Sequence, residues 1–133
     1  MSNPLPIVGE ELDDLVLEEG FRRRRARKTA DSFLDYVVSV WPWFQIEEVH
    51  CLIAEKFEAM RRGEITRLIL NLPPRTGKSR LASILLPTWW IGHMPSDQIM
   101  QISHNKDLAS DFGREARNLL ALDPYRELFK TEL

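Results

Sequence analysis

The sequence has one cysteine, Cys51, among its 133 residues, so no disulfide can form within the chain. It also lacks a long hydrophobic run, because its best apolar stretch, Leu81 to Ile91, is short and contains Pro87. The first residues lack the basic start and apolar core of a secretory signal. Together these absences predict a cytoplasmic protein in a reducing compartment, with no membrane partner.

A large excess of one charge is missing as well. The formal net charge is −2 at pH 7, so the chain as a whole is not typical of a nucleic-acid-binding protein. The charges are unevenly placed, however, because acidic residues crowd positions 10 to 19 and a basic run follows from Arg22 to Lys28. No aromatic residue interrupts this run to stack on bases. The run is either a solvated or partner-facing surface, or a contact for DNA phosphates.

What is present points most clearly to a phosphate-binding loop. An apolar run ends at two prolines and leads through Arg75, Thr76 and Gly77 to Lys78 and Ser79, where a helical pattern begins. Successive backbone N–H groups in such a loop can wrap a phosphate. The lysine then reaches the terminal phosphates of ATP, and the serine hydroxyl binds Mg²⁺. The usual pattern has a glycine where this sequence has Leu72, so a proline-rich turn with a solvated lysine remains the alternative.

The order of the expected elements predicts an α/β fold. We expect an incomplete P-loop NTPase sheet of the ASCE type, with parallel strands and covering helices, preceded by N-terminal helices. Residues 1–42 are predicted to form the helical segment, and 43–133 the N-terminal portion of the ATPase domain. The patterns predict helices near 11–40, 46–62, 78–86, 106–120 and 125–129, and strands at 67–72 and 98–103.

From Trp43 to Phe129 the chain resembles the large terminase subunits, which package double-stranded DNA in tailed bacteriophages. The resemblance rests on Gly63 to Arg75 with the Gly-Lys-Ser that follows, on Pro87 to Gly92, and on Tyr125 to Phe129. That family often lacks the first loop glycine, and it often has histidine where this chain has Thr76. The resemblance implies ATP and Mg²⁺ as cofactors and a location in the host cytoplasm. It also implies double-stranded DNA, the portal and the small terminase subunit as partners, with a ring oligomer at full length.

The resemblance adds roles for individual residues. Arg75 is similar to the loop arginine that approaches the terminal phosphate in this family. Phe44 and Gln45 resemble an adenine-recognition segment, in which Gln45 offers both a donor and an acceptor to the base. The alternative for these two is an aromatic anchor and a glutamine at a helix start.

A second acidic motif, which ATP hydrolysis of this type requires, is not found. The apolar run from Leu119 to Asp123 continues a helical stripe and is followed by Pro124, so it is predicted to end a helix. The nuclease carboxylates of terminases have no counterpart either. We therefore expect the sequence to stop before the acidic motif, with an incomplete catalytic set and nucleotide binding without hydrolysis by this chain alone. The alternative is a non-enzymatic assembly or DNA-binding module that uses Arg22 to Lys28.

Overall fold

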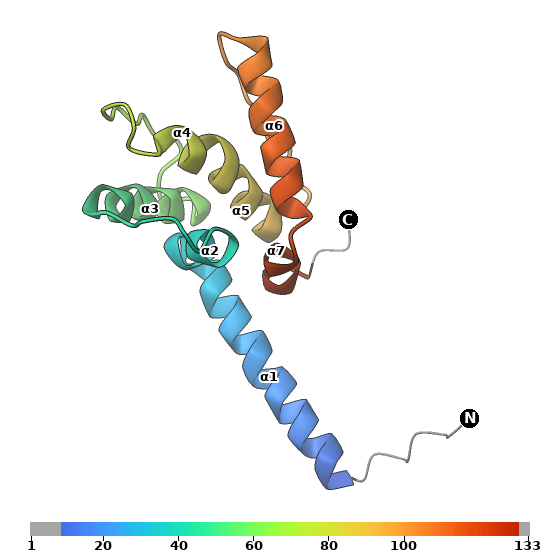
Figure 1. The fold of residues 1–133 in the computed structure, drawn as a ribbon. Coiled ribbons are helices and arrows are strands. Elements are labelled where there is room, and N and C mark those ends of the chain that lie inside the picture. The colour runs from blue at the N-terminus through green and yellow to red at the C-terminus, as the bar shows by residue number, and fades with distance from the viewer. Residues whose placement is uncertain (1–8, 131–133) are drawn as a thin grey trace.

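The computed structural model describes residues 9 to 130, and the side chains from residue 16 onward. Within that range every regular element is a helix (Figure 1). The elements in chain order are α1 (Gly9–Asp31), α2 (Phe33–Val40), α3 (Glu48–Arg61), α4 (Lys78–Arg80), the π-helical segment η1 (Leu81–Leu85), α5 (Leu86–His93), α6 (Lys106–Leu120) and α7 (Asp123–Leu128).

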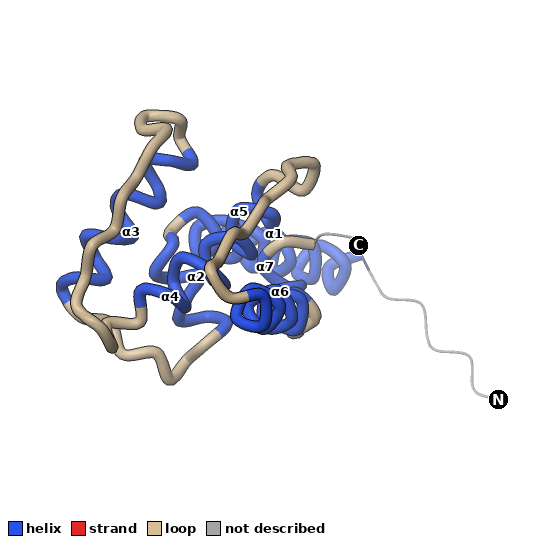
Figure 2. Tube along the Cα trace, turned by 90° about the horizontal axis from the view of Figure 1, so that it is seen from above, coloured by secondary structure: helices blue, strands red, loops and turns tan. Residues whose placement is uncertain are grey.

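The predicted α/β fold is wrong for this part of the chain. Both expected strands, 67–72 and 98–103, are loops, and Figure 2 shows no strand between residues 9 and 130. Ile69, Met100 and Ile102 are 92%, 84% and 87% exposed, although a strand covered on both faces would bury them. A strand is held by hydrogen bonds to a neighbouring strand. These two segments do not pair with each other, and no other described segment supplies a neighbour, so the parallel P-loop sheet does not form.

The long helix expected near residues 11–40 forms as two helices. Gly20 does not interrupt α1, and the break falls at Ser32 instead. Ser32 has extended backbone angles (φ −86°, ψ 122°), and its hydroxyl accepts a hydrogen bond from the Asp35 N–H at 3.3 Å. This is the geometry of an N-cap, so Ser32 both ends α1 and starts α2. Most of α1 consequently projects from the rest of the molecule (Figure 1).

Three predictions about helices are confirmed. The helix over 106–120 is α6, and α3 ends one residue before the expected position. Gly63, which follows α3, has a left-handed φ of 76°, and its N–H donates to the Met60 carbonyl at 2.9 Å, as in a Schellman cap. Leu119 and Leu120 end α6, and Asp123 begins α7 after two connecting residues, so this run does not form an apolar strand.

The helix that starts at Lys78 continues through Pro87 to His93. Proline has no N–H, so the Ser83 carbonyl four residues earlier loses its usual donor. The backbone adopts π geometry here, with the Leu86 N–H bonded to the Leu81 carbonyl. The Gln101 side-chain amide then donates to the Ser83 carbonyl. These two adjustments allow the helix to continue past Pro87, so the predicted end near residue 86 is wrong.

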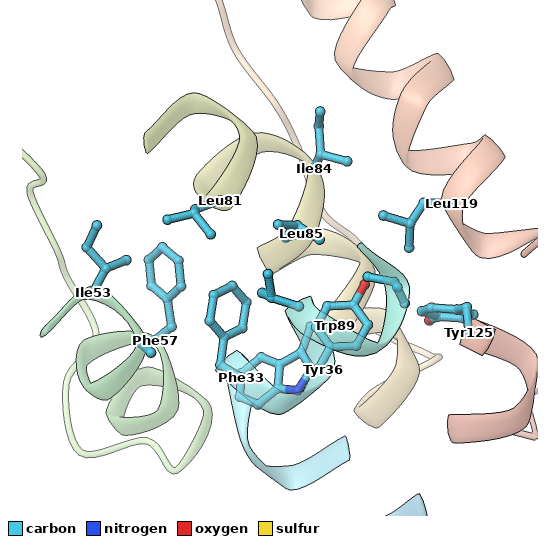
Figure 3. Close-up of a cluster of buried hydrophobic side chains, with 13 residues drawn as sticks. Phe33, Tyr36, Ile53, Phe57, Leu81, Ile84, Leu85, Trp89, Leu119 and Tyr125 are labelled. Carbon is cyan, nitrogen blue, oxygen red and sulfur yellow. The ribbon is translucent and has the colours of Figure 1, made fainter. Parts of the chain in front are cut away.

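One hydrophobic core joins the helices (Figure 3). Trp89 lies at its centre, with its indole N–H donating to the Ala30 carbonyl at 2.6 Å and its ring meeting Phe33 edge-on at 5.3 Å. The core takes residues from both predicted parts of the chain, the helical segment 1–42 and the portion 43–133. Its buried members are Phe33, Tyr36, Val37, Val40, Ile53, Ala54, Phe57, Leu81, Ile84, Leu85, Trp89, Leu119 and Tyr125.

A polar network crosses this core at Thr88, which is fully buried. Its hydroxyl donates to the Ile84 carbonyl at 2.8 Å and accepts from the Tyr36 hydroxyl at 2.6 Å. The Tyr125 hydroxyl donates to the Thr88 carbonyl at 2.8 Å. Burial raises the pKa of both tyrosines, so they stay neutral and act as donors. The network therefore joins α2, α5 and α7 without burying a charge.

His93 is expected to make stability depend on pH. Burial lowers the pKa of His93 below its ordinary value of 6.5, and the nearby positive charge of Arg61 lowers it further. Near pH 6.5 the unfolded chain therefore binds more protons than the folded chain. It follows that the free energy of unfolding is larger above this pH and decreases as the pH falls through it. Urea unfolding between about pH 5 and 8 is expected to show this slope in the parent chain and a smaller one in His93→Gln. The exposed His104 provides a matched variant, and an equal reduction of the slope in His104→Gln would contradict the assignment.

Candidate phosphate-binding loop

Two left-handed residues shape the loop between the prolines and the helix. Arg75 has φ 68° and Gly77 has φ 74°. Glycine adopts this region freely, whereas arginine pays about 1–2 kcal/mol for it. Left-handed residues within a turn point successive backbone N–H groups to one side and form an anion-binding concavity. Arg75 is the third residue of a turn from Pro73 to Thr76, where a type II turn with proline at the second position has a positive φ. The angle therefore fits both a phosphate-binding loop and the alternative of a proline-rich turn.

Gly77 is also the N-cap of the continuous helix from Lys78 to His93. Its carbonyl accepts the Leu81 N–H at 3.0 Å, which closes the first turn. The N–H groups of Arg75 and Gly77 donate to no other residue in the range 9 to 130, whereas Thr76 closes a turn with Pro73. The first N–H groups of the helix lack partners within it as well. Unpaired donors and the positive end of a helix thus lie together at the loop.

Two side chains fold back onto the loop and hold its shape. The Thr76 hydroxyl donates to the Pro73 carbonyl at 3.0 Å. The Lys78 ammonium donates to the Leu72 carbonyl at 2.5 Å, so the lysine reaches back across the loop to the residue before the prolines. An ammonium group has three donors. Lys78 can therefore keep this bond and still donate to a phosphate.

His50 on α3 connects the loop to the helical body. Its Nδ1 accepts the Glu47 N–H at 2.9 Å in a capping box, so Nδ1 carries no proton. The proton of the neutral ring is then on Nε2, which donates to the Thr76 carbonyl at 2.8 Å. His50 is 5% exposed, and both of its ring nitrogens have hydrogen-bond partners. Its contact with the loop was missed, because it joins residues 26 positions apart.

Phe44 lies against the same loop. Its ring contacts His50 with centroids 5.0 Å apart, and a Cβ added to Gly77 would stand 3.7 Å from it. The structure thus places Phe44 beside the predicted phosphate loop. Gln45 is the next residue and is exposed, and its amide bonds to nothing in the described part of the chain. The position of Phe44 also fits the alternative of an aromatic anchor.

The remaining predicted residues lie on the open side of the loop. Arg75 and Ser79 are exposed, and neither side chain has a partner among the residues described. Arg80 is held differently, because its guanidinium stacks over the Trp41 ring at 5.4 Å. Arg75 and Lys78 therefore supply the positive charge that is free to meet an anion.

The residues fit a bound phosphate better than a bare metal ion. No group of three or more histidine, cysteine or acidic residues within the described ranges could hold a metal. Mg²⁺ normally keeps several waters and takes substrate phosphates as ligands. Ser79 could add one oxygen ligand to a Mg²⁺ ion that arrives with a nucleotide.

Two cavities among the described residues lie away from the loop. One of about 750 Å³ lies between α1 and α7, and one of about 530 Å³ lies between the α5 region and residues 97–102. The loop is instead an open surface feature. A nucleotide bound here would be held mainly by its phosphates, with Phe44 as a neighbouring apolar surface.

Comparisons with protein-family models, with curated proteins and with solved structures give no match to this chain. Among the helices of residues 9 to 130, none combines the length and the apolar character needed to cross a membrane.

Proposed function

We propose that the loop from Pro73 to Ser79 binds the phosphates of ATP together with Mg²⁺. The observation that carries this proposal is the pair of left-handed residues, Arg75 and Gly77, at the start of a helix. Their geometry leaves backbone N–H groups unpaired where the helix is positive. Lys78 already lies across the loop and would reach the terminal phosphates, while the Ser79 hydroxyl would bind Mg²⁺.

The proposal covers binding and not hydrolysis. Cleavage of ATP needs an acid that holds Mg²⁺ and a residue that positions the attacking water. The one acidic candidate in the sequence, Asp123, is exposed at the start of α7. Arg75 would contact the terminal phosphate without completing a catalytic set.

We assign this binding to DNA packaging, as part of a terminase large subunit. What supports the assignment is the residue pattern around the loop and the position of Phe44 beside it. Double-stranded DNA, the portal and the small terminase subunit would be the partners, in a ring formed at full length in the host cytoplasm. A parallel sheet is no part of this proposal, because the described residues form none.

Lys78→Ala tests the binding step. The variant loses a charge-assisted hydrogen bond to the nucleotide, which is worth about 1.5–3 kcal/mol. Affinity for Mg-ATP in calorimetric titration is therefore expected to fall by roughly 10- to 100-fold. Lys106→Ala is the control, because Lys106 is also the first residue of a helix and carries the same charge, at an exposed position away from the loop.

Equal affinity in the parent chain and in Lys78→Ala, or an equal loss in Lys106→Ala, would contradict the binding proposal. Steady release of phosphate by the parent chain would contradict the claim that this chain binds without hydrolysing.

A further inference from the structure

The projecting helix α1 carries an exposed apolar patch. Val16, Leu17 and Phe21 are 64%, 59% and 66% exposed, although all three are large hydrophobic side chains. Together with Gly20 they occupy adjoining positions on one side of the helix, at spacings of one, four and five residues. A Cβ added to Gly20 would meet nothing within 4 Å, so the patch has a shallow centre. We call these four residues the α1 patch.

The patch is turned away from the helix that α1 already contacts. Glu19 bonds Arg22 and Arg23 on its own helix, and it accepts from the Lys130 ammonium at 3.2 Å. These bonds hold the pKa of Glu19 at about 2, so the carboxylate stays charged. With about 100° of rotation per residue, Glu19 and the centre of the patch are on different sides of α1. The contact with the α7 region therefore leaves the α1 patch uncovered.

The charges of α1 are divided around the α1 patch. Positions 10 to 19 hold six acidic residues and no basic one, and positions 22 to 28 hold six basic residues and no acidic one. We call these positions the acidic half and the basic half. Two copies of such a helix match when they run antiparallel, because each acidic half then lies along the basic half of the other copy. A parallel arrangement would place like charges together.

We propose that two copies of this chain associate through antiparallel α1 helices. A two-fold axis between positions 20 and 21 places Phe21 of each copy over Gly20 of the other. The same register sets Leu17 against Arg24, whose aliphatic stem can cover it. It also sets positions 13 and 14 against positions 28 and 27, so that acidic residues face basic ones. Such an interface is self-complementary, as two-fold symmetry requires.

Nucleic acid is the other partner that a basic run suggests, and the charges favour a second copy. A duplex would be attracted to the basic half and repelled by the acidic half beside it. Arg22 and Arg23 already bond Glu19, which reduces the charge free to meet phosphate. Binding of a duplex would also leave the α1 patch without a role, whereas pairing of two α1 helices uses both charge halves and the patch.

Analytical ultracentrifugation of the whole chain tests the pairing. One helix pair buries less than the roughly 1,600 Å² of a standard interface, so the dimer is expected to be weak and concentration-dependent. The parent chain is therefore measured at concentrations up to about 1 mM. We expect the parent to dimerise, and we expect D13K/D14K and R27E/K28E each to remain monomeric because like charges then face each other.

An equimolar mixture of the two variants is the decisive sample. In the mixture, the new lysines of one chain face the new glutamates of the other, and the remaining charges match as before. A heterodimer is expected, and its formation also shows that both variants are folded. E48K/E55K on the exposed surface of α3 makes the same change in net charge as D13K/D14K and is expected to dimerise like the parent. Phe21→Ser, a change at an exposed position, is expected to weaken the dimer at least about 10-fold.

Four results would overturn the proposal: a parent chain that is monomeric throughout, charge variants that dimerise unmixed, a mixture that stays monomeric, or an unchanged dimer in Phe21→Ser. Salt-sensitive binding of a DNA duplex by a monomeric parent, lost in R27E/K28E, would assign the basic half to nucleic acid instead.

Discussion

Replacing Trp89 with alanine is expected to reduce the free energy of unfolding by about 3–5 kcal/mol. Trp89 is fully buried, and its removal leaves a large cavity between α2, α3 and α5. The change also removes the indole N–H that donates to the Ala30 carbonyl at the end of α1. Domains of this kind have total stabilities of about 5–15 kcal/mol, so a substantial fraction of the variant would be unfolded.

A second contact adds to the effect of losing Trp89. The Arg61 guanidinium lies 5.1 Å from the centre of the indole ring, and its Nε is buried without a hydrogen-bond partner among the described residues. Removing the ring takes away the favourable electrostatic contact that this cation has. Arg61 keeps only its 3.6 Å ion pair with Asp31.

Trp90→Ala is the matched control for Trp89→Ala. Trp90 is only partly buried, and its indole N–H donates to the exposed Asp97 carboxylate at 2.9 Å. We expect this variant to lose no more than about 1–2 kcal/mol, because little cavity remains after truncation. Urea unfolding followed by far-ultraviolet circular dichroism measures both losses. Equal losses at positions 89 and 90 would show that the core is not organised around Trp89.

The second large effect is expected at Gly77. Valine is strongly disfavoured at φ 74°, so Gly77→Val forces the backbone out of the left-handed region or strains it by about 2 kcal/mol. A Cβ there also lies 3.7 Å from Phe44 and 3.9 Å from His50, and the valine methyl groups would crowd both rings. Because the N–H groups of the loop would then point elsewhere, Mg-ATP affinity is expected to fall about 30-fold or more.

Gly63→Val is the control for Gly77→Val, because it introduces similar backbone strain at a position outside the loop. Gly63 has φ 76°, close to that of Gly77, and a Cβ there meets nothing within 4 Å. Both variants are expected to lose about 2 kcal/mol of stability by unfolding in urea. Only Gly77→Val should lose nucleotide affinity in calorimetric titration. An equal loss of affinity in both, or in neither, would contradict the role of Gly77 in holding phosphate.

The helices could be predicted from sequence because their signals are local. In α6 the apolar positions recur at helical spacing, and Asn105 caps the start by accepting the Asp107 N–H at 2.8 Å. The two predicted strands are wrong, because an apolar run indicates a buried segment but does not say which other segment covers it. Residues 67–72 and 98–103 have strand-like sequences and no neighbouring strand, so in this structure they are loops.

The candidate site was predictable in part for the same reason. The left-handed turn at Gly77 and the helix start at Lys78 follow from adjacent residues, and both are present. The bond from His50 to the Thr76 carbonyl depends on how α3 packs, and no short pattern encodes it. Likewise, the rescue of the Ser83 carbonyl by Gln101 joins residues 18 positions apart.

The sequence by itself determined where α3 and α6 lie, where the helix after the loop begins, and which residues form the loop. Helix periodicity, capping and backbone freedom act over a few residues, so one chain carries that information directly. Only the tertiary structure decided that no sheet forms between residues 9 and 130, that Trp89 is the centre of the core, and that His50 and Phe44 support the loop. These outcomes depend on contacts between distant segments, whose free energy is set by packing and by the available hydrogen-bond partners.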